Sequence, residues 1–204
     1  MTPIDEVLKL VDVIKARFAE RAAVNDAIGQ ESALVLSLLQ PLPPFSGTFS
    51  PSRHPAIRHL DAALRPGDSS DPSILEAIHV IAFNLPWQYA YPERADSPRL
   101  QEKIAFAEII GPDAPFRSDH VCLGVTLIGP DTFYPPHRHP ATELYLVVAG
   151  EATWTAGKAS HIESPRSFVL HRSQIVHAML TGASSLLAIY TWTGEDIGTS
   201  STYV

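Results

Sequence analysis

The second half of the chain constrains the fold most, because its apolar runs are short and are interrupted by turn residues. After the segment 86-PWQYAYPERADSP-98, these runs are rich in Val, Ile, Thr and aromatic residues, with Gly and Pro between them. Many short strands with regular turn signals are typical of an antiparallel sandwich or barrel. A hairpin is expected to turn at Ala149-Gly150. The expected strands are 103–110, 120–128, 143–149, 151–156, 166–170, 175–180 and 185–192.

The first ninety or so residues show a different periodicity, with apolar residues at helical spacing. The first helix is expected from Ile4 to Val24, started by Thr2 and by Pro3 in its first turn. Further helices are expected over 32–39, 55–64 and 72–83, the last capped by Asp71. The predicted fold class is therefore mainly β with α. An N-terminal helical segment, residues 1–95, is expected to pack on a β-barrel formed by residues 96–204.

The composition and charge exclude several classes of protein. Hydrophobic residues make up 45% of the 204 residues and charged residues 18%, as is typical of a packed globular chain. The net charge of -7, with no run of Lys and Arg, argues against a nucleic-acid partner. The single cysteine, Cys122, excludes an intrachain disulfide and lies in an apolar run that predicts a buried strand. Without a signal-peptide pattern or a membrane-length apolar stretch, a cytoplasmic protein with no membrane partner is expected.

The stretch 133-FYPPHRHPATELYLVVAG-150 contains the residues most suited to chemistry. His137 and His139 are two residues apart, so in a strand they face the same way, and Glu143 and Tyr145 share a face of the next strand. If both faces look into one barrel, two imidazoles and a carboxylate converge as ligands for a divalent first-row metal ion. His177, alone in the apolar strand 175–180, is the candidate fourth ligand, since an unpartnered buried imidazole is unfavourable. Such a set accepts iron, manganese, zinc, cobalt or nickel, so the identity of the metal stays open.

The spacing H-x-H-x3-E-x6-G resembles the first motif of the cupin superfamily, and its residues here are His137, His139, Glu143 and Gly150. The stretch 172-RSQIVHAM-179 resembles a degenerate second motif. The departures from the superfamily pattern fall at positions that shape turns rather than bind metal, namely Gly129, Arg172, Gln174 and Thr181. This resemblance implies a jelly-roll β-barrel with the metal ion inside.

A narrower resemblance covers roughly Pro86 to Trp192. Tyrosines flank the expected ligands at Tyr134 and Tyr145, and Trp192 follows His177 by fifteen residues, which together with the helical first half resembles the cupin-type dimethylsulfoniopropionate lyases. That resemblance implies a metal-dependent lyase that cleaves dimethylsulfoniopropionate by β-elimination to dimethyl sulfide and acrylate. It implies Tyr145 as the general base, with Tyr134 as assistant or alternative. Aromatic faces attract a sulfonium cation, so Trp192 and Tyr134 are expected to bind substrate, with Trp87, Tyr89 and Tyr91 as further candidates.

Two other functions fit the same ligand set. One is a cupin dioxygenase or isomerase acting on a small carboxylate, which needs no tyrosine base, and the other is a small-molecule-binding cupin without turnover. The chain is expected to be a monomer or a homodimer, because its apolar helices could cover their own barrel or a partner's. The remaining histidines lack ligand spacing and are expected to lie outside the site: His54, His59, His79, His120, His161 and His171.

Overall fold

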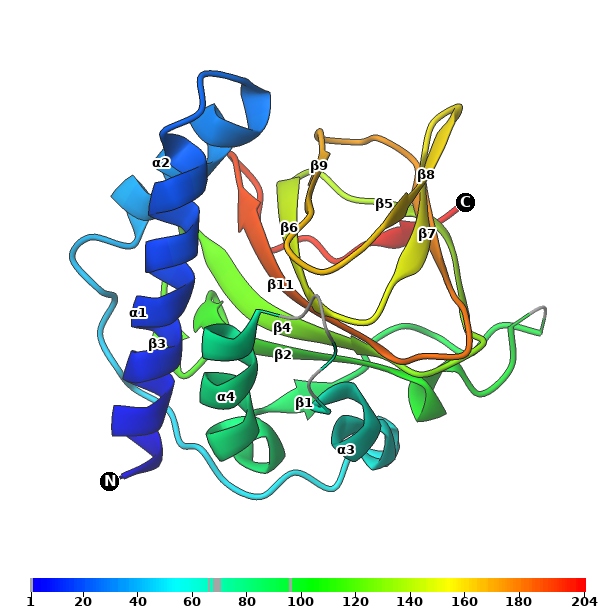
Figure 1. The fold of residues 1–204 in the computed structure, drawn as a ribbon, viewed down its shortest axis with the longest axis horizontal. Helices are drawn as coiled ribbons and strands as arrows, with labels where there is room; N and C mark the ends of the chain where they lie inside the picture. The colour runs from blue at the N-terminus through cyan, green and yellow to red at the C-terminus, as the bar shows by residue number, and fades with distance from the viewer. Residues whose placement is uncertain (1, 66, 68–70, 96) are drawn as a thin grey trace.

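Two facing β-sheets form the C-terminal half of the protein in a computed structural model that describes residues 2–65, 67, 71–95 and 97–204 (Figure 1). The seven-stranded sheet has the order β1-β2-β4-β11-β6-β9, with β3 paired to β2. Its strands are β1 (Trp87–Gln88), β2 (Ile104–Gly111), β3 (Phe116–Arg117), β4 (Cys122–Ile128), β6 (Thr142–Ala149), β9 (Phe168–His171) and β11 (Leu186–Thr193). The five-stranded sheet has the order β12-β5-β10-β7-β8. Its strands are β5 (Phe133–Arg138), β7 (Ala152–Ala156), β8 (Ala159–Glu163), β10 (His177–Thr181) and β12 (Thr202–Tyr203).

Helices precede the sheets, as the sequence predicts. They are α1 (Pro3–Ala22), α2 (Ala27–Leu38), α3 (Leu60–Ala63) and α4 (Pro72–Ile81), with 3-10 turns η1 (Pro55–His59), η2 (Ala82–Asn84) and η3 (Leu100–Glu102). Asp71 caps α4 by accepting hydrogen bonds from the backbone N–H groups of Ser73 and Ile74. The same carboxylate lies 2.5 Å from Arg17 Nε, which links α1 to α4. Helix α2 begins earlier than predicted because Asp26 caps it through the backbone N–H of Gly29.

The helices cover the outer face of the seven-stranded sheet (Figure 1). Leu144, Leu146 and Val148 alternate along β6 and belong to the same buried cluster as Leu10 and Ile14 of α1. The rings of Phe18 in α1 and Phe168 in β9 meet edge to face, with centroids 5.4 Å apart. Because alternate residues of a strand face opposite ways, the other face of this sheet, its inner face, is directed toward the five-stranded sheet.

The predicted hairpin between β6 and β7 is wrong. Strand β6 pairs with β11 and β9, whereas β7 pairs with β10 and β8 in the other sheet. Both edges of β6 are therefore occupied, and β7 has no edge there to join. Gly150 marks the crossing from one sheet to the other with a φ of +75°, and a Cβ at this position would lie 2.0 Å from the Ser185 carbonyl oxygen. A left-handed backbone this close to another carbonyl requires glycine.

Three further sequence predictions concern the course of the chain. Cys122 is buried in β4, as its apolar surroundings predict. Among the described residues, none of the helices combines the length and apolar character needed to cross a membrane. The division near residue 96 stays a prediction; Asp96 itself lies outside the described residues, and β1, from the N-terminal side of this division, pairs with β2.

Candidate active site

The inner face of the seven-stranded sheet presents a row of four directly opposed residues. Cys122 of β4 pairs with Trp192 of β11, Trp192 with Glu143 of β6, and Glu143 with His171 of β9. Two residues further along their strands, Tyr190 and Tyr145 also pair with each other. Because residues two apart share a face, these tyrosines face the same side as Glu143.

The five-stranded sheet contributes histidines from the opposite side. His177 of β10 pairs with His137 of β5, and their ring centroids are 4.1 Å apart. His137 also pairs with Tyr203 of β12. His139 follows β5 at the start of the connection to β6, so it lies where the chain passes between the sheets. The site is therefore assembled from both sheets and from the link between them.

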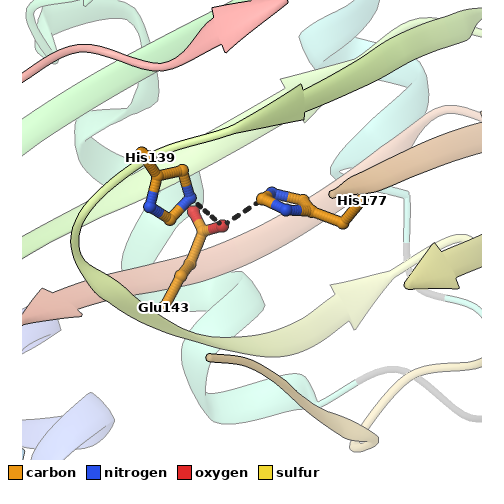
Figure 2. Close-up of side chains that lie close together, drawn as sticks. All are labelled: His139, Glu143 and His177. Atoms are coloured by element: carbon orange, nitrogen blue, oxygen red, sulfur yellow. Dashed lines mark hydrogen bonds and ion pairs between the residues drawn. The ribbon is translucent and has the colours of Figure 1, made fainter. Parts of the chain in front are cut away.

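Glu143 is the centre of this arrangement (Figure 2). Its Oε2 lies 3.0 Å from His139 Nε2 and 3.2 Å from His177 Nε2. The same oxygen is 3.7 Å from His171 Nδ1, while Oε1 accepts a hydrogen bond of 2.8 Å from Trp192 Nε1. Burial opposes ionisation of this carboxyl, but its close contacts with His139, His171 and His177 prevail and hold its pKa well below the usual range. Glu143 is therefore a buried carboxylate anion at neutral pH.

The ring orientations leave the Nε2 atoms available. Nδ1 of His137 lies 2.8 Å from the Pro135 carbonyl oxygen, Nδ1 of His139 lies 3.0 Å from that of Ala141, and Nδ1 of His177 lies 2.9 Å from that of Ile175. When Nδ1–H donates to a carbonyl, the neutral imidazole presents its Nε2 lone pair to the site. Histidines that bind metal ions are commonly oriented by this kind of hydrogen bond.

The donor set fits a divalent metal ion. One ligand atom each of His139, Glu143 and His177 lie within 4.8 Å of one another, and all three residues are buried. Nε2 of His177 lies close to Glu143 but has no hydrogen-bond partner in the described part of the chain, so its lone pair is unsatisfied. An anionic carboxylate with two buried imidazoles and an unsatisfied buried nitrogen is the composition expected of such a site.

His137 lies beside this cluster. Its ring stacks on Tyr134 with centroids 4.0 Å apart, and it lines the cavity between the sheets. Burial and the neighbouring His177 lower the pKa of His137 to about 3, so its ring is neutral at neutral pH. Of the four predicted ligands, the structure thus brings three into one compact cluster and places the fourth against it.

His171 belongs to the site although its spacing did not indicate this. It is buried, and its ring centroid is 4.1 Å from that of His177. Neither of its ring nitrogens has a hydrogen-bond partner among the described residues. Burial lowers the pKa of His171, which favours the neutral ring. Its position follows from pairing with Glu143 across β6 and β9, a long-range register that the sequence does not display.

Aromatic side chains complete the cavity, which has a volume of about 260 Å³. Tyr134, Tyr145 and Trp192 line it, as does Tyr91 from the segment that follows β1. Burial, with the charge of Glu143, raises the pKa of Tyr145 well above its usual value, and burial does the same for Tyr134. The other aromatic candidates differ in position. Trp87 donates to the Ala82 carbonyl in the helix-side core, and Tyr89 is hydrogen-bonded to the hydroxyl of Tyr203 at 2.7 Å.

Two facing sheets that enclose a His–Glu cluster define a cupin-like fold with a candidate metal centre. Residues 31–188 match the model of the dimethylsulfoniopropionate lyase family, and this chain belongs to that family of carbon–sulfur lyases. The match confirms the resemblance drawn from the tyrosines and the His–Glu spacing.

Individual relatives agree with this membership. The chain is 32% identical over 164 residues to a protein assigned as the dimethylsulfoniopropionate lyase DddL of Cereibacter sphaeroides, covering 79% of this chain and 68% of that one. It is 30% identical over 110 residues to the dimethylsulfoniopropionate lyase DddQ of Ruegeria pomeroyi, covering 53% of this chain and 55% of DddQ. The crystal structure of the Ruegeria pomeroyi DddQ superposes with a TM-score of 0.79 at 24% identity, over 98% of this chain and 96% of that one.

Proposed function

We propose that this protein cleaves dimethylsulfoniopropionate by β-elimination to dimethyl sulfide and acrylate, with Tyr145 as the general base. The observation that supports this most is the juxtaposition of Glu143 and Tyr145 on one inner face. The carboxylate and its imidazoles meet a buried hydroxyl in one cavity. Family membership supports the substrate.

Four residues would hold the metal ion: His137, His139, Glu143 and His177. A divalent ion held there would act as a Lewis acid that offsets the negative charge developing on the substrate carboxylate. The acceptor carbonyls behind the histidines keep the rings turned toward the site. Trp192 positions Glu143 through its indole hydrogen bond and stacks on His139, with ring centroids 4.3 Å apart.

Tyr145 would take the proton from the carbon alpha to the carboxylate. The electron pair of that C–H bond forms the double bond of acrylate, and the pair of the C–S bond leaves with dimethyl sulfide. Burial raises the pKa of the Tyr145 phenol, so the phenolate requires a compensating positive charge nearby. Tyr134 and Trp192 would line the walls against which the substrate lies, and Tyr134 would assist or replace the base.

The test of this function is direct. Metal-loaded protein is incubated with dimethylsulfoniopropionate, and dimethyl sulfide in the headspace and acrylate in solution are measured. The two products should form in equal amounts. Release of neither product by fully metallated, folded protein would contradict the proposed reaction and favour a dioxygenase, isomerase or binding protein.

The ligand assignment has its own test. Ala substitutions of His137, His139, Glu143 and His177, one at a time, should each lower the bound metal per folded chain, measured by elemental analysis after dialysis. His161→Ala serves as the control, since this exposed histidine lies in β8, outside the site. Full metal occupancy after loss of two of the four ligands would contradict the assignment.

A further inference from the structure

The cavity has acidic lining residues and, within the described part of the chain, no basic ones. Glu108 and Asp113 line it together with Glu143, whereas no Lys or Arg does. A metal ion would offset the negative charge of the Glu143 carboxylate, but it would leave the negative charge of the Glu108 carboxylate without compensation. Such a cavity favours a ligand that has a cationic end.

Glu108 faces the same cavity as the candidate base but from another strand. It pairs with Gly124 of β4, Gly124 pairs with Tyr190 of β11, and Tyr190 pairs with Tyr145 of β6. Glu108 and Tyr145 are therefore three strands apart in one row across the inner face. At about 4.8 Å per strand, their backbones are separated by about 14 Å. The cavity thus has a Glu143 end and a Glu108 end.

Aromatic rings lie beside Glu108. A Cβ at Gly124 would be 2.5 Å from Tyr190 Cε1, so the ring of Tyr190 occupies the space that the missing side chain leaves. Phe106 shares a face with Glu108, two residues earlier in β2, and its ring centroid is 6.3 Å from that of Tyr190 and 5.9 Å from that of Tyr134. Ring faces of this kind attract organic cations.

Among the residues that the structure describes, the carboxyl of Glu108 has no cationic partner. The groups that act on its pKa are the thiol of Cys122 and the backbone and charge of Asp113, with no basic side chain among them. Burial, with the charge of Asp113, raises the pKa of Glu108 to about 7. A half-buried carboxylate without a counter-charge is unfavourable, and a cation bound next to it would remove this penalty.

We propose that Glu108 binds the cationic end of the substrate and selects onium compounds over uncharged molecules of the same shape. This inference rests on the proposed lyase function, which places the substrate carboxylate at the Glu143 end. The three-carbon acid then extends toward β2, and its sulfonium group lies against Glu108, Phe106 and Tyr190. Glu108 is thereby a residue that determines specificity, distinct from the metal ligands and the base.

Two inhibitors of matched shape test the proposal. 3-(Trimethylammonio)propionate bears a cationic head, and 4,4-dimethylpentanoate replaces its nitrogen by carbon. Their dissociation constants are measured with metal-loaded, full-length protein for the wild type, Glu108→Gln, Glu108→Asp and the exposed control Glu151→Gln. The wild type and the control should prefer the cation by about tenfold or more, since a desolvated ion pair and cation–π contacts together exceed about 1.4 kcal/mol. Glu108→Gln should lose this preference by weakening the cation alone, and Glu108→Asp should retain it.

Two results would overturn the inference. One is equal dissociation constants of the two inhibitors for the wild type, a measurement that requires no variant. The other is an unchanged preference in folded Glu108→Gln. Release of dimethyl sulfide by the wild type is scored separately, so the two hypotheses fail independently. Turnover without a charge preference removes the role of Glu108, whereas a charge preference that depends on Glu108, without turnover, supports the cation site and removes the lyase function.

Discussion

The two faces of the seven-stranded sheet are built from the same strands yet lie in different surroundings. Along β6, Leu144, Leu146 and Val148 pack under the helices, whereas Glu143 and Tyr145 face the cavity. The outer residues are apolar and belong to one buried cluster with residues of α1 and α4. The inner residues lie close to imidazoles, hydroxyls and carboxylates. Whether a residue of β6 contributes to stability or to chemistry therefore depends on the face of the sheet on which its side chain lies, and the face alternates along the strand.

This contrast teaches that stability and activity should be separable in β6. A change on the outer face should alter the free energy of unfolding and spare turnover per folded molecule. A change on the inner face should do the reverse, provided that it keeps the shape of the side chain.

Removing the helices should have the largest effect. Deletion of residues 1–85 exposes the buried outer face of the sheet, including Leu144, Leu146 and Val148, so the remaining chain should aggregate and lose its cooperative unfolding transition. Solubility and the thermal melt of the truncated and full chains measure this. A soluble, fully active truncated protein would show that the helices do not stabilise the sheet.

Tyr145→Phe should be the sharpest change on the inner face. It removes one oxygen, so the melting temperature and metal content should stay unchanged while turnover falls by about 10²–10⁴-fold, as for a lost general base. Solvent deuterium exchange at the alpha carbon, measured with kcat, separates loss of the base from loss of binding. Tyr134→Phe, the matched control on β5, should reduce kcat less. Near wild-type turnover in both variants would exclude a tyrosine base.

Leu146→Ala is the matched change on the outer face, one residue from Tyr145. Leu146 is buried in the cluster shared with α1, so its truncation should destabilise the fold by about 2–5 kcal/mol. Denaturant unfolding measures the loss, and kcat per folded molecule should match the wild type. A large fall in kcat with unchanged stability would mean that the two faces are not independent.

His171→Ala should have a smaller effect, on metal affinity. Because His171 is packed against Glu143 and His177, its loss should weaken metal binding by about 10–100-fold, the range typical of residues that support metal ligands. Competition with a chelator of known affinity measures the affinity for the metal ion, and His161→Ala provides the exposed-histidine control. Unchanged metal affinity would reduce His171 to a packing residue.

The smallest expected effect is on the pH dependence of cation binding. Glu108 has a pKa of about 7, raised by burial and by the charge of Asp113, and it faces Cys122 on β4 and Tyr190 on β11. The carboxylate form attracts the cation, so affinity for 3-(trimethylammonio)propionate should be greatest well above pH 7 and should fall as the pH drops through 7, until it reaches the affinity of Glu108→Gln. The neutral isostere, and Glu108→Gln with either inhibitor, should lack this loss. An identical pH profile in Glu108→Gln would assign the titration to another group.

Much of the fold was predictable because its signals are local. The cap at Asp71, the helical spacing in α1 and the alternation of Glu143 with Tyr145 each involve residues within a few positions of one another. Local patterns of this kind reflect hydrogen bonds and faces that form within one element.

The remainder depends on pairing between distant segments. The β6–β7 hairpin was wrong because β9 and β11 compete for the same edges, and His171 was missed because it enters the site only through its register with Glu143. Glu108 was likewise invisible, since its place in the cavity is set by successive pairings with Gly124 and Tyr190. Spacing within one segment contains no information about such registers.

Strand β6 uses both of its edges and both of its faces, and this limits how related proteins can differ in sequence. With β11 on one edge, β9 on the other and both faces in use, an insertion or deletion of one residue would turn Glu143 toward the helices and Leu144 toward the cavity. Substitutions can accumulate here singly, but length changes cannot. Any alignment of this chain with a working relative should therefore run without a gap from Thr142 to Ala149, and changes in length should collect in the loops at either side.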